Sequence, residues 1–350
     1  MLLLVKMAFY DGLFNAFGLR DWCDQSASTA PMSMADLLKA NNAGSVDPNA
    51  VAFPFPSLDN LNDACAHFPQ TRDLTAGIEN AFLSGKDYLK IVLDPITQPL
   101  SWALDGTLYV FTNTSWWIIV PLLVAFAWFV SRSKPVTIFV ALSFLFLGAI
   151  DHLHVEMQTL SIIFVCTGLS VLFGVPIGIA MSKSDRLQRS LVPVLDLLQT
   201  LPTFVYLIPL IFLFSVTESK LYGIAIILYA IVPVIRLTDL GIRLVDKDVI
   251  EAADAFGMDA KQRMRKVELP LVLPNIMAGI NQTIMMSLAM VVIASLVSAP
   301  GLGMLVLRGI RNLELGVGIV AGIGIVLLAV ILDRTSKAAL GRVDKANKKH

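Results

Sequence analysis

The stretch that decides the fold is DVIEAADAFGMDAKQ, residues 248–262, which runs on to Leu-Pro at 269–270. It is a polar island between two long apolar segments. Asp248 is followed three residues later by Glu251, a pattern that predicts an N-cap with its capping-box partner at the start of a short helix. Gly257 can adopt the left-handed conformation that ends such a helix.

The second half of this island repeats the same capping pattern. Asp259 with Gln262 three residues later predicts a second short helix. Ala252 and Ala253 are small enough to let another protein's surface come close, and Phe256 supplies a single large side chain. The sequence therefore predicts a helix–glycine–helix elbow on the membrane surface, shaped to plug into a partner.

Composition places the chain in a membrane. It is 56% hydrophobic and only 15% charged, with a mean hydropathy of +0.71, whereas soluble domains carry about 25% charged residues. The formal net charge is zero, so no nucleic-acid partner is indicated. An all-α polytopic protein with membrane lipid around it is expected.

The elbow resembles the EAA loop of ATP-binding-cassette importer permeases. The resemblance rests on Glu251-Ala252-Ala253, on Gly257, and on Leu269-Pro270 at the matching spacing, with Val267 where that family has isoleucine. It implies that the elbow is a coupling helix seated in a cleft of a separate ATPase. The alternative is an ordinary amphipathic loop between two membrane helices. The coupling residues implied are Glu251, Ala252, Ala253, Phe256, Gly257, Leu269 and Pro270.

Seven apolar segments predict about seven transmembrane helices, although three of them are shorter than the roughly 20 residues that a span needs. The segments are 116–130, 136–150, 157–181, 203–214, 222–237, 271–297 and 315–332. Basic residues then predict the orientation. Many basic residues follow the first and third segments and lie in the elbow loop and the C-terminal tail, which are therefore expected in the cytoplasm. The loops expected on the outer side hold only Lys220, Arg308 and Arg311. The C-terminus is therefore expected in the cytoplasm and the N-terminal tail outside.

Four parts are expected along the chain. Residues 1–115 are an extracytoplasmic or interfacial tail, with amphipathic helices predicted at 9–19 and within 76–112. Residues 116–156 hold two accessory spans, residues 157–334 a five-helix core with a coupling loop at 239–270, and residues 335–350 a basic cytoplasmic tail. Cys23 and Cys65 share the outward tail and are candidates for a disulfide, although two unpaired thiols remain an equal alternative.

No catalytic constellation is found in the sequence. Ser84-Gly85-Lys86-Asp87 lacks the glycine and the Ser or Thr of a phosphate-binding loop, so ATP and Mg²⁺ are expected on a partner, with no cofactor in this chain. The run from Asp151 to Glu156 contains two histidines and suggests a metal cluster, but polar residues are expected in such a turn in any case.

Polar and aromatic residues inside the apolar segments are candidates for a translocation path. Gln199, Thr203 and Tyr206 are spaced to share one helical face, although Pro202 and Pro209 would kink or break that helix. Aromatic faces and methionine suit a methylated cation. The alternative is hydrogen bonding that holds helices together. The candidate path residues are Gln199, Thr203, Phe204, Tyr206, Asn281, Gln282 and Met285.

A wider resemblance covers residues 157–334. The stretches at 195–209, 277–283, 290–295 and 307–310 look like the permease subunit of proline/glycine-betaine importers, whose relatives carry choline or trimethylamine N-oxide. The resemblance implies a type I importer fold in the bacterial inner membrane and a function in osmoprotection. It also implies a homodimer that works with two copies of a cytoplasmic ATPase and a periplasmic substrate-binding protein.

Three other functions stay open at this point. An ion-coupled secondary betaine transporter would usually have ten or more spans with internal repeats. A channel would need a selectivity ring, which the sequence does not show. A permease of the same superfamily for another small solute, such as an amino acid, would share the elbow.

Overall fold

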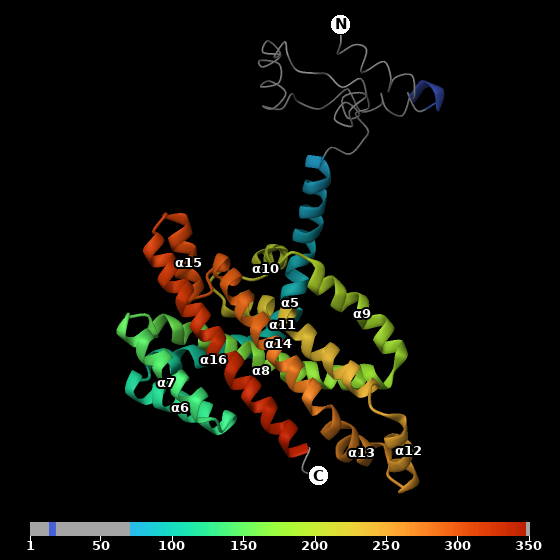
Figure 1. Ribbon diagram of the computed structural model, residues 1–350. Coiled ribbons are helices and arrows are strands. Elements are labelled where there is room, and N and C mark those ends of the chain that lie inside the picture. The colour runs from blue at the N-terminus through green and yellow to red at the C-terminus, as the bar shows by residue number, and fades with distance from the viewer. Residues whose placement is uncertain (1–13, 19–70, 348–350) are drawn as a thin grey trace, which may run out of the picture. The chain divides into compact units, whose positions relative to one another are not determined.

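The computed structural model describes residues 14–18 and 71–347 (Figure 1). The chain divides into two compact units, residues 1–85 and 86–350. Of the helix predicted at 9–19, residues 14–16 are helical and Gly18 closes the turn with φ +67°. Cys23 and Cys65 lie outside the described residues, so their disulfide stays a prediction.

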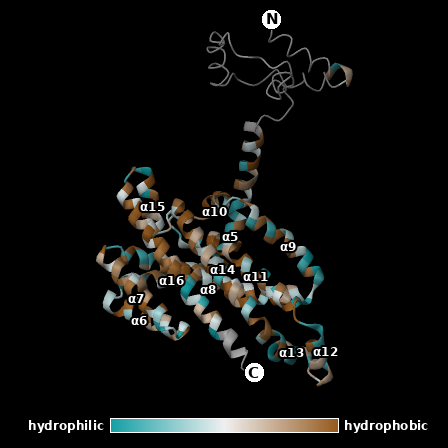
Figure 2. Cartoon of the chain, viewed as in Figure 1, coloured by the Kyte–Doolittle hydropathy of each residue, from teal (hydrophilic) through white to brown (hydrophobic). Residues whose placement is uncertain are grey.

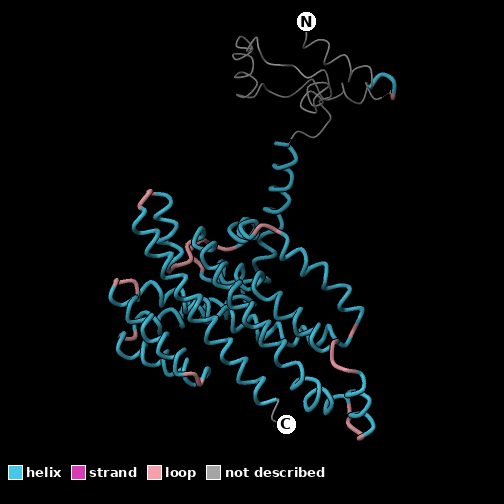
Figure 3. The backbone as a smooth tube through the Cα atoms, viewed as in Figure 1, coloured by secondary structure: helices cyan, strands magenta, loops and turns pink. Residues whose placement is uncertain are grey.

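All regular structure in the described residues is helical (Figure 3). The helices of the first half are α5 (Thr71–Asn113), α6 (Trp116–Ser131), α7 (Lys134–Ala149), α8 (Leu153–Lys183), α9 (Asp185–Thr200), η1 (Thr203–Tyr206) and α10 (Leu207–Leu213). Those of the second half are α11 (Ser219–Arg243), α12 (Lys247–Ala255), α13 (Ala260–Arg263), η2 (Met264–Glu268), α14 (Leu269–Ala294), η3 (Ser295–Val297), α15 (Leu302–Arg311) and α16 (Leu315–Asn347).

Helix α5 corrects the expectation of several amphipathic helices at 76–112. One unbroken helix of 43 residues covers this region. Pro95 and Pro99 lie inside it and remove two backbone donors. Because they are four residues apart, both missing hydrogen bonds fall on one side of the helix, which continues past them.

The core of the second unit is built around α11, which packs most extensively against α14 and α8 (Figure 1). Glycines make these approaches close, as is usual where membrane helices meet. A Cβ atom on Gly178 of α8 would lie 2.7 Å from the carbonyl oxygen of Ile235 in α11. Cys166 of α8 is fully buried in this contact, as expected of a packing residue, and its thiol lies 3.9 Å from the carbonyl oxygen of Gly223.

Each of the seven predicted apolar segments falls on helical structure, although 203–214 is divided between η1 and α10 and 271–297 between α14 and η3. Much of α14 and α16 is brown in Figure 2. Four helical stretches are long and apolar enough to cross a membrane: Leu153–Lys183, Ser219–Arg243, Ala260–Val297 and Leu315–Arg342. Two bent pairs, α5 with α6 and α9 with α10, bring that number up to six if each pair is one span, and α7 is a shorter apolar helix. The count of seven spans stays a prediction.

The break predicted at Pro202 is confirmed, and it removes the helical face that Gln199, Thr203 and Tyr206 were expected to share. The chain bends by 106° between these helices, at Leu201 and Pro202. Proline disfavours helical geometry in the residue before it, and Leu201 is accordingly extended, with ψ 135°. Pro209 lies in the first turn of α10 and does not break that helix.

The turn before α15 has a tightly constrained geometry. Gly301 has φ +118° and lies against Thr159 of α8 so closely that a Cβ atom would be 2.3 Å from the Thr159 hydroxyl oxygen. The backbone N–H of Leu302 donates to the same oxygen at 2.9 Å. The first helical residue of α15 is therefore held directly on α8.

Candidate functional site

The elbow begins two residues earlier than predicted. Asp246, and not Asp248, is the N-cap of α12, and its Oδ1 accepts from the backbone N–H of Asp248 at 3.0 Å. Both aspartates could cap a helix, so the choice depends on where α11 ends, at Arg243. Asp248 then lies in the first turn of α12, where its negative charge stabilises the helix by interacting with the positive end of the helix dipole.

Gly257 ends α12 as predicted. Its φ is +73°, and a Cβ atom there would meet nothing within 4 Å, so the backbone conformation alone calls for glycine. The N–H of Met258 donates to the carbonyl of Ala253 at 3.2 Å, and that of Gly257 to the carbonyl of Asp254 at 2.9 Å. These bonds satisfy the last carbonyls of α12 and reverse the chain.

The second helix of the elbow is capped as predicted. Asp259 Oδ1 accepts from the N–H of Gln262 at 2.6 Å. Helix α13 then passes into η2, which is a π-helical turn, and η2 continues into α14 with Pro270 in its first turn. A π turn carries hydrogen bonds between residues five apart, and such turns are frequent at functional sites.

A single guanidinium group joins the parts of the elbow. Arg263 Nη1 donates to both carboxylate oxygens of Asp254, at 2.6 and 2.7 Å, and so connects α13 to the end of α12. Its Nε donates to Oε1 of Glu268 at 3.0 Å, at the far end of the π turn, and Glu268 is buried. The arginine therefore fixes α12 relative to the start of α14.

This arrangement was not foreseen from the sequence. Asp254 and Arg263 are nine residues apart, and only the chain reversal at Gly257 brings them together. Arg263 and Glu268 are five residues apart, a spacing that would put them about 140° apart around a regular α-helix. The π turn places them on one side of the helix. The signal in the sequence that could have predicted this ion pair is two opposite charges five residues apart beside the expected coupling loop.

The outer surface of the elbow is open. Phe256 is 85% exposed, and Glu251 and Ala252 are exposed on α12. Ala253 is buried, so of the two alanines predicted to lie against a partner only Ala252 is exposed. A single aromatic side chain on a braced turn suits insertion into a pocket of another protein.

The candidate path residues lie on three elements. Thr203, Phe204 and Tyr206 belong to η1, and Asn281, Gln282 and Met285 belong to α14. Gln199 belongs to α9, on the other side of the bend. Helices η1 and α14 are in contact, so the two larger sets lie on neighbouring elements, and Gln199 shares no helical face with either.

Two of these residues are already bound within the protein. The amide of Asn281 donates to Asp333 of α16 at 3.4 Å, and its oxygen accepts from the Ser336 hydroxyl. Tyr206 is buried and its hydroxyl donates to the carbonyl oxygen of Leu198 across the bend. Phe204 and Gln282 are exposed. They are therefore the side chains of this group best placed to meet a solute.

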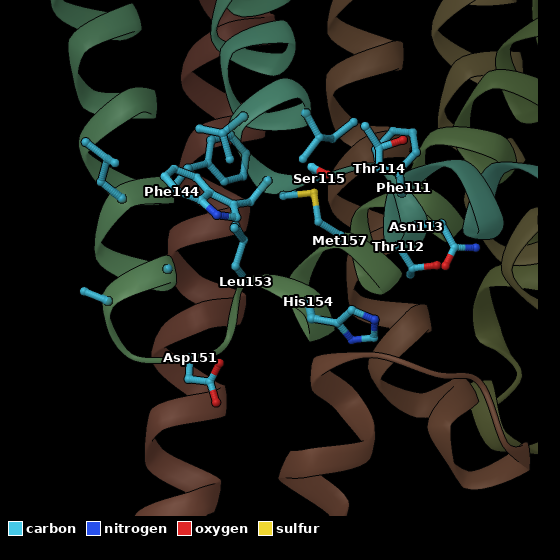
Figure 4. Close-up of a pocket in the computed structure, with 16 residues that line it drawn as sticks. Phe111, Thr112, Asn113, Thr114, Ser115, Phe144, Asp151, Leu153, His154 and Met157 are labelled. Carbon is cyan, nitrogen blue, oxygen red and sulfur yellow. The ribbon is translucent and has the colours of Figure 1, made fainter.

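The run from Asp151 to Glu156, which suggested a metal cluster in the sequence, borders a cavity of about 610 Å³ (Figure 4). Asp151 and His154 line it together with Phe111, Phe144 and Met157, at the α5–α6 junction and the α7–α8 turn. Within the described residues, no group of three His, Cys, Asp or Glu side chains is arranged to hold a metal ion. The path residues named above do not line this cavity.

Comparisons with known proteins agree with this architecture. Residues 170–345 match the family model described as binding-protein-dependent transport system inner membrane component. The chain is 44% identical over 214 residues to the glycine betaine transport system permease protein OpuAB of Bacillus subtilis, covering 61% of this chain and 75% of that protein. It is 45% identical over 197 residues to the glycine betaine/proline betaine transport system permease protein ProW of Escherichia coli, covering 56% of this chain and 55% of that protein.

A third relative and a solved structure extend the comparison. The trimethylamine N-oxide transport system permease protein TmoV of Ruegeria pomeroyi is 39% identical over 196 residues, covering 56% of this chain and 30% of that protein. The inward-facing MetNI methionine ABC transporter superposes with a TM-score of 0.50 at 19% identity, over 55% of this chain and 95% of that chain. At that identity the match shows the fold alone, which this chain shares with a chain of that transporter. These are components of transport systems and not enzymes, and this chain, a multi-pass membrane protein, belongs to the family of binding-protein-dependent transport system inner membrane components.

Proposed function

We propose that this chain is the permease of an ATP-driven importer for glycine betaine or a related methylated amine such as proline betaine, choline or trimethylamine N-oxide. The observation that carries the proposal is the identity of 44% over 214 residues and 45% over 197 residues to two betaine permeases. The similarity to a permease for trimethylamine N-oxide supports a wider class of methylated amines.

Energy would reach this chain through the elbow. The exposed Phe256 and the open face of α12 would seat in a cleft of a cytoplasmic ATPase, which would bind ATP and Mg²⁺. Two copies of the permease would then serve two copies of the ATPase, because a two-fold ATPase needs two elbows and each chain supplies one. A periplasmic binding protein would deliver the solute.

The path would run beside η1 and α14. A quaternary nitrogen carries no N–H group, so it is recognised by aromatic faces and by packing of its methyl groups. Phe204 offers such a face, and the Gln282 amide can meet a carboxylate or N-oxide end. Capture would occur on the binding protein, so the path need only attract the solute weakly.

The proposed orientation places the elbow and the C-terminus in the cytoplasm of a bacterial inner membrane. Two contacts between distant segments support it. Arg243 at the end of α11 donates to Asp185 and to the Met181 carbonyl, at the α8–α9 turn. Arg342 near the end of α16 donates to the carbonyl of Phe129 at the end of α6. Each contact joins two basic segments that the orientation places on the cytoplasmic side.

Uptake by proteoliposomes tests the function. The permease is reconstituted with the ATPase and binding protein proposed as its partners, and uptake of labelled glycine betaine is measured with ATP inside the vesicles. We expect ATP-dependent uptake that choline, proline betaine or trimethylamine N-oxide reduces and that methionine or glutamine leaves unchanged. Uptake driven by an ion gradient without ATP would indicate a secondary transporter. Competition by amino acids alone would indicate another branch of the family.

A further inference from the structure

A second large cavity lies between the accessory helices and the core, beside the direct contacts of α6 and α7 with α16. It measures about 540 Å³ and is lined by α6 and α7 on one side and by α5, α8 and α16 on the other. Leu160 and the rings of Phe126, Phe129 and Phe164 contribute to its wall. The Thr335 hydroxyl, the single polar side-chain group of that wall, donates to the carbonyl of Ile331 at 2.7 Å. Such a cavity offers water no partner and favours a hydrocarbon occupant.

Two guanidinium groups converge on one wall residue of this cavity, Phe129. The Arg132 guanidinium lies over its ring, 5.6 Å from the centroid. Arg342, from the far end of α16, donates from Nη1 to its carbonyl oxygen at 3.3 Å. Lys134 follows two residues after Arg132, and all three cations are exposed. Among the described side chains, none of the three forms an ion pair.

The apolar cavity and the cations beside it are complementary to an amphiphile, a molecule with a hydrocarbon chain and an anionic headgroup. We infer that this cleft binds an anionic phospholipid, with an acyl chain among the phenylalanines and the phosphate between Arg132 and Arg342. Guanidinium groups bind phosphate oxygens through paired, charge-assisted hydrogen bonds. Under the proposed orientation these arginines face the cytoplasmic leaflet, which carries the anionic lipids. The lipid would fill the gap between the accessory helices and the core and so hold α6 and α7 in place.

Lipid retention by the purified full-length protein tests the inference. Detergent-solubilised protein is incubated with dioleoyl phosphatidylglycerol or dioleoyl phosphatidylcholine, and bound lipid is counted by native mass spectrometry alongside the melting temperature. We expect phosphatidylglycerol to be retained and to raise the melting temperature by several degrees, and phosphatidylcholine to be retained about tenfold less. Arg132→Gln with Arg342→Gln should remove that preference.

Controls separate this site from general charge and from the headgroup alone. Lys183→Gln with Arg186→Gln removes two exposed cations from the α8–α9 turn and should leave the preference intact. Ala125→Phe, at an exposed position of the cavity wall, should reduce retention while both arginines remain. Equal retention of both lipids would overturn the inference. So would equal protection by glycerol phosphate, which has no acyl chain, or loss of preference only in the control pair.

Discussion

Arg263 shows how one side chain can set the geometry of a whole loop. Its contacts with Asp254 and Glu268 are the only ion pairs within the described residues of the elbow. They join α12, α13 and the π turn η2 to one another. Glu268 is buried, so removing its partner leaves a carboxylate without compensation, at a local cost of about 2 kcal/mol. The Asp254 contact is half exposed and should contribute less.

We therefore predict that Arg263→Ala lowers transport-coupled ATP hydrolysis several-fold while the permease still inserts and binds the ATPase. Arg263→Lys keeps the charge but cannot reach both carboxylates, so it should recover only part of the coupling. The measurement is the rate of ATP hydrolysis stimulated by the solute-loaded binding protein in proteoliposomes. Arg265→Ala, at an exposed position two residues away, is the matched control. An unchanged stimulated rate in Arg263→Ala would show that the brace has no part in coupling.

A second prediction concerns Gly257. Its φ of +73° is unfavourable for a β-branched residue by about 1–2 kcal/mol, so Gly257→Ile should distort the elbow and reduce uptake. Asparagine tolerates this conformation, and Gly257→Asn should keep most of the activity. Because the space around the position is open, a steric clash cannot explain the difference. Uptake assays of the two variants, with surface expression matched, decide it; equal activity in both would contradict the prediction.

At the scale of helices, the path residues fall into bound and unbound groups. Asn281 bridges α14 to Asp333 and Ser336 of α16, which is the structural alternative raised from the sequence. We predict that Asn281→Leu lowers the melting temperature by several degrees and leaves the competition profile of methylated amines unchanged. Phe204→Ala, on an exposed ring, should lower the maximal uptake rate with little loss of stability. A shift of substrate preference in Asn281→Leu would contradict this prediction and show that Asn281 contacts the solute.

The sequence predicted helices well and their ends less well. Apolar runs located α8, α11, α14 and α16 because a membrane leaves the backbone few alternatives to helix. The cap at Asp259 and the end at Gly257 were predictable because each depends on neighbours within a few residues. The cap at Asp246 was missed because Asp248 offers the same chemistry. The bend after α9 was underestimated because one proline permits either a kink or a full break.

Contacts between distant residues were beyond the reach of patterns. Nothing local distinguishes Tyr206 as a hydrogen-bond donor to Leu198, or Arg342 as a partner of Phe129. Such contacts depend on how helices meet, and a single sequence records only the composition of each helix. For the same reason the cavity between the accessory pair and the core could not be anticipated.

For the whole molecule, the topology is the open prediction. We expect reporters fused after residue 255 or 345 to be active in the cytoplasm and a reporter fused after residue 100 to be active outside. Alkaline phosphatase and green fluorescent protein fusions give opposite readouts and provide the test. The contact of Arg342 with Phe129 predicts that a fusion in the α6–α7 turn, after residue 133, reports the same side as the C-terminus. A periplasmic signal there would reduce the number of spans.

The π turn at Met264–Glu268 has a consequence for the angular phase of the elbow. A π turn holds about one residue more than an α-helical turn, so it aligns residues five apart, such as Arg263 and Glu268, on one side of the helix. Removing Lys266 would close the turn into a regular α-helix, in which residues four apart share a side, and the direction of Phe256 would be kept. A deletion within the regular part of α14 meets no wide turn that can absorb it, so it would rotate the elbow by about 100° around the helix axis. The aim of the elbow should therefore tolerate a shorter turn at Met264–Glu268 and not a shorter α14: deletion of Lys266 should impair uptake far less than deletion of one residue within α14.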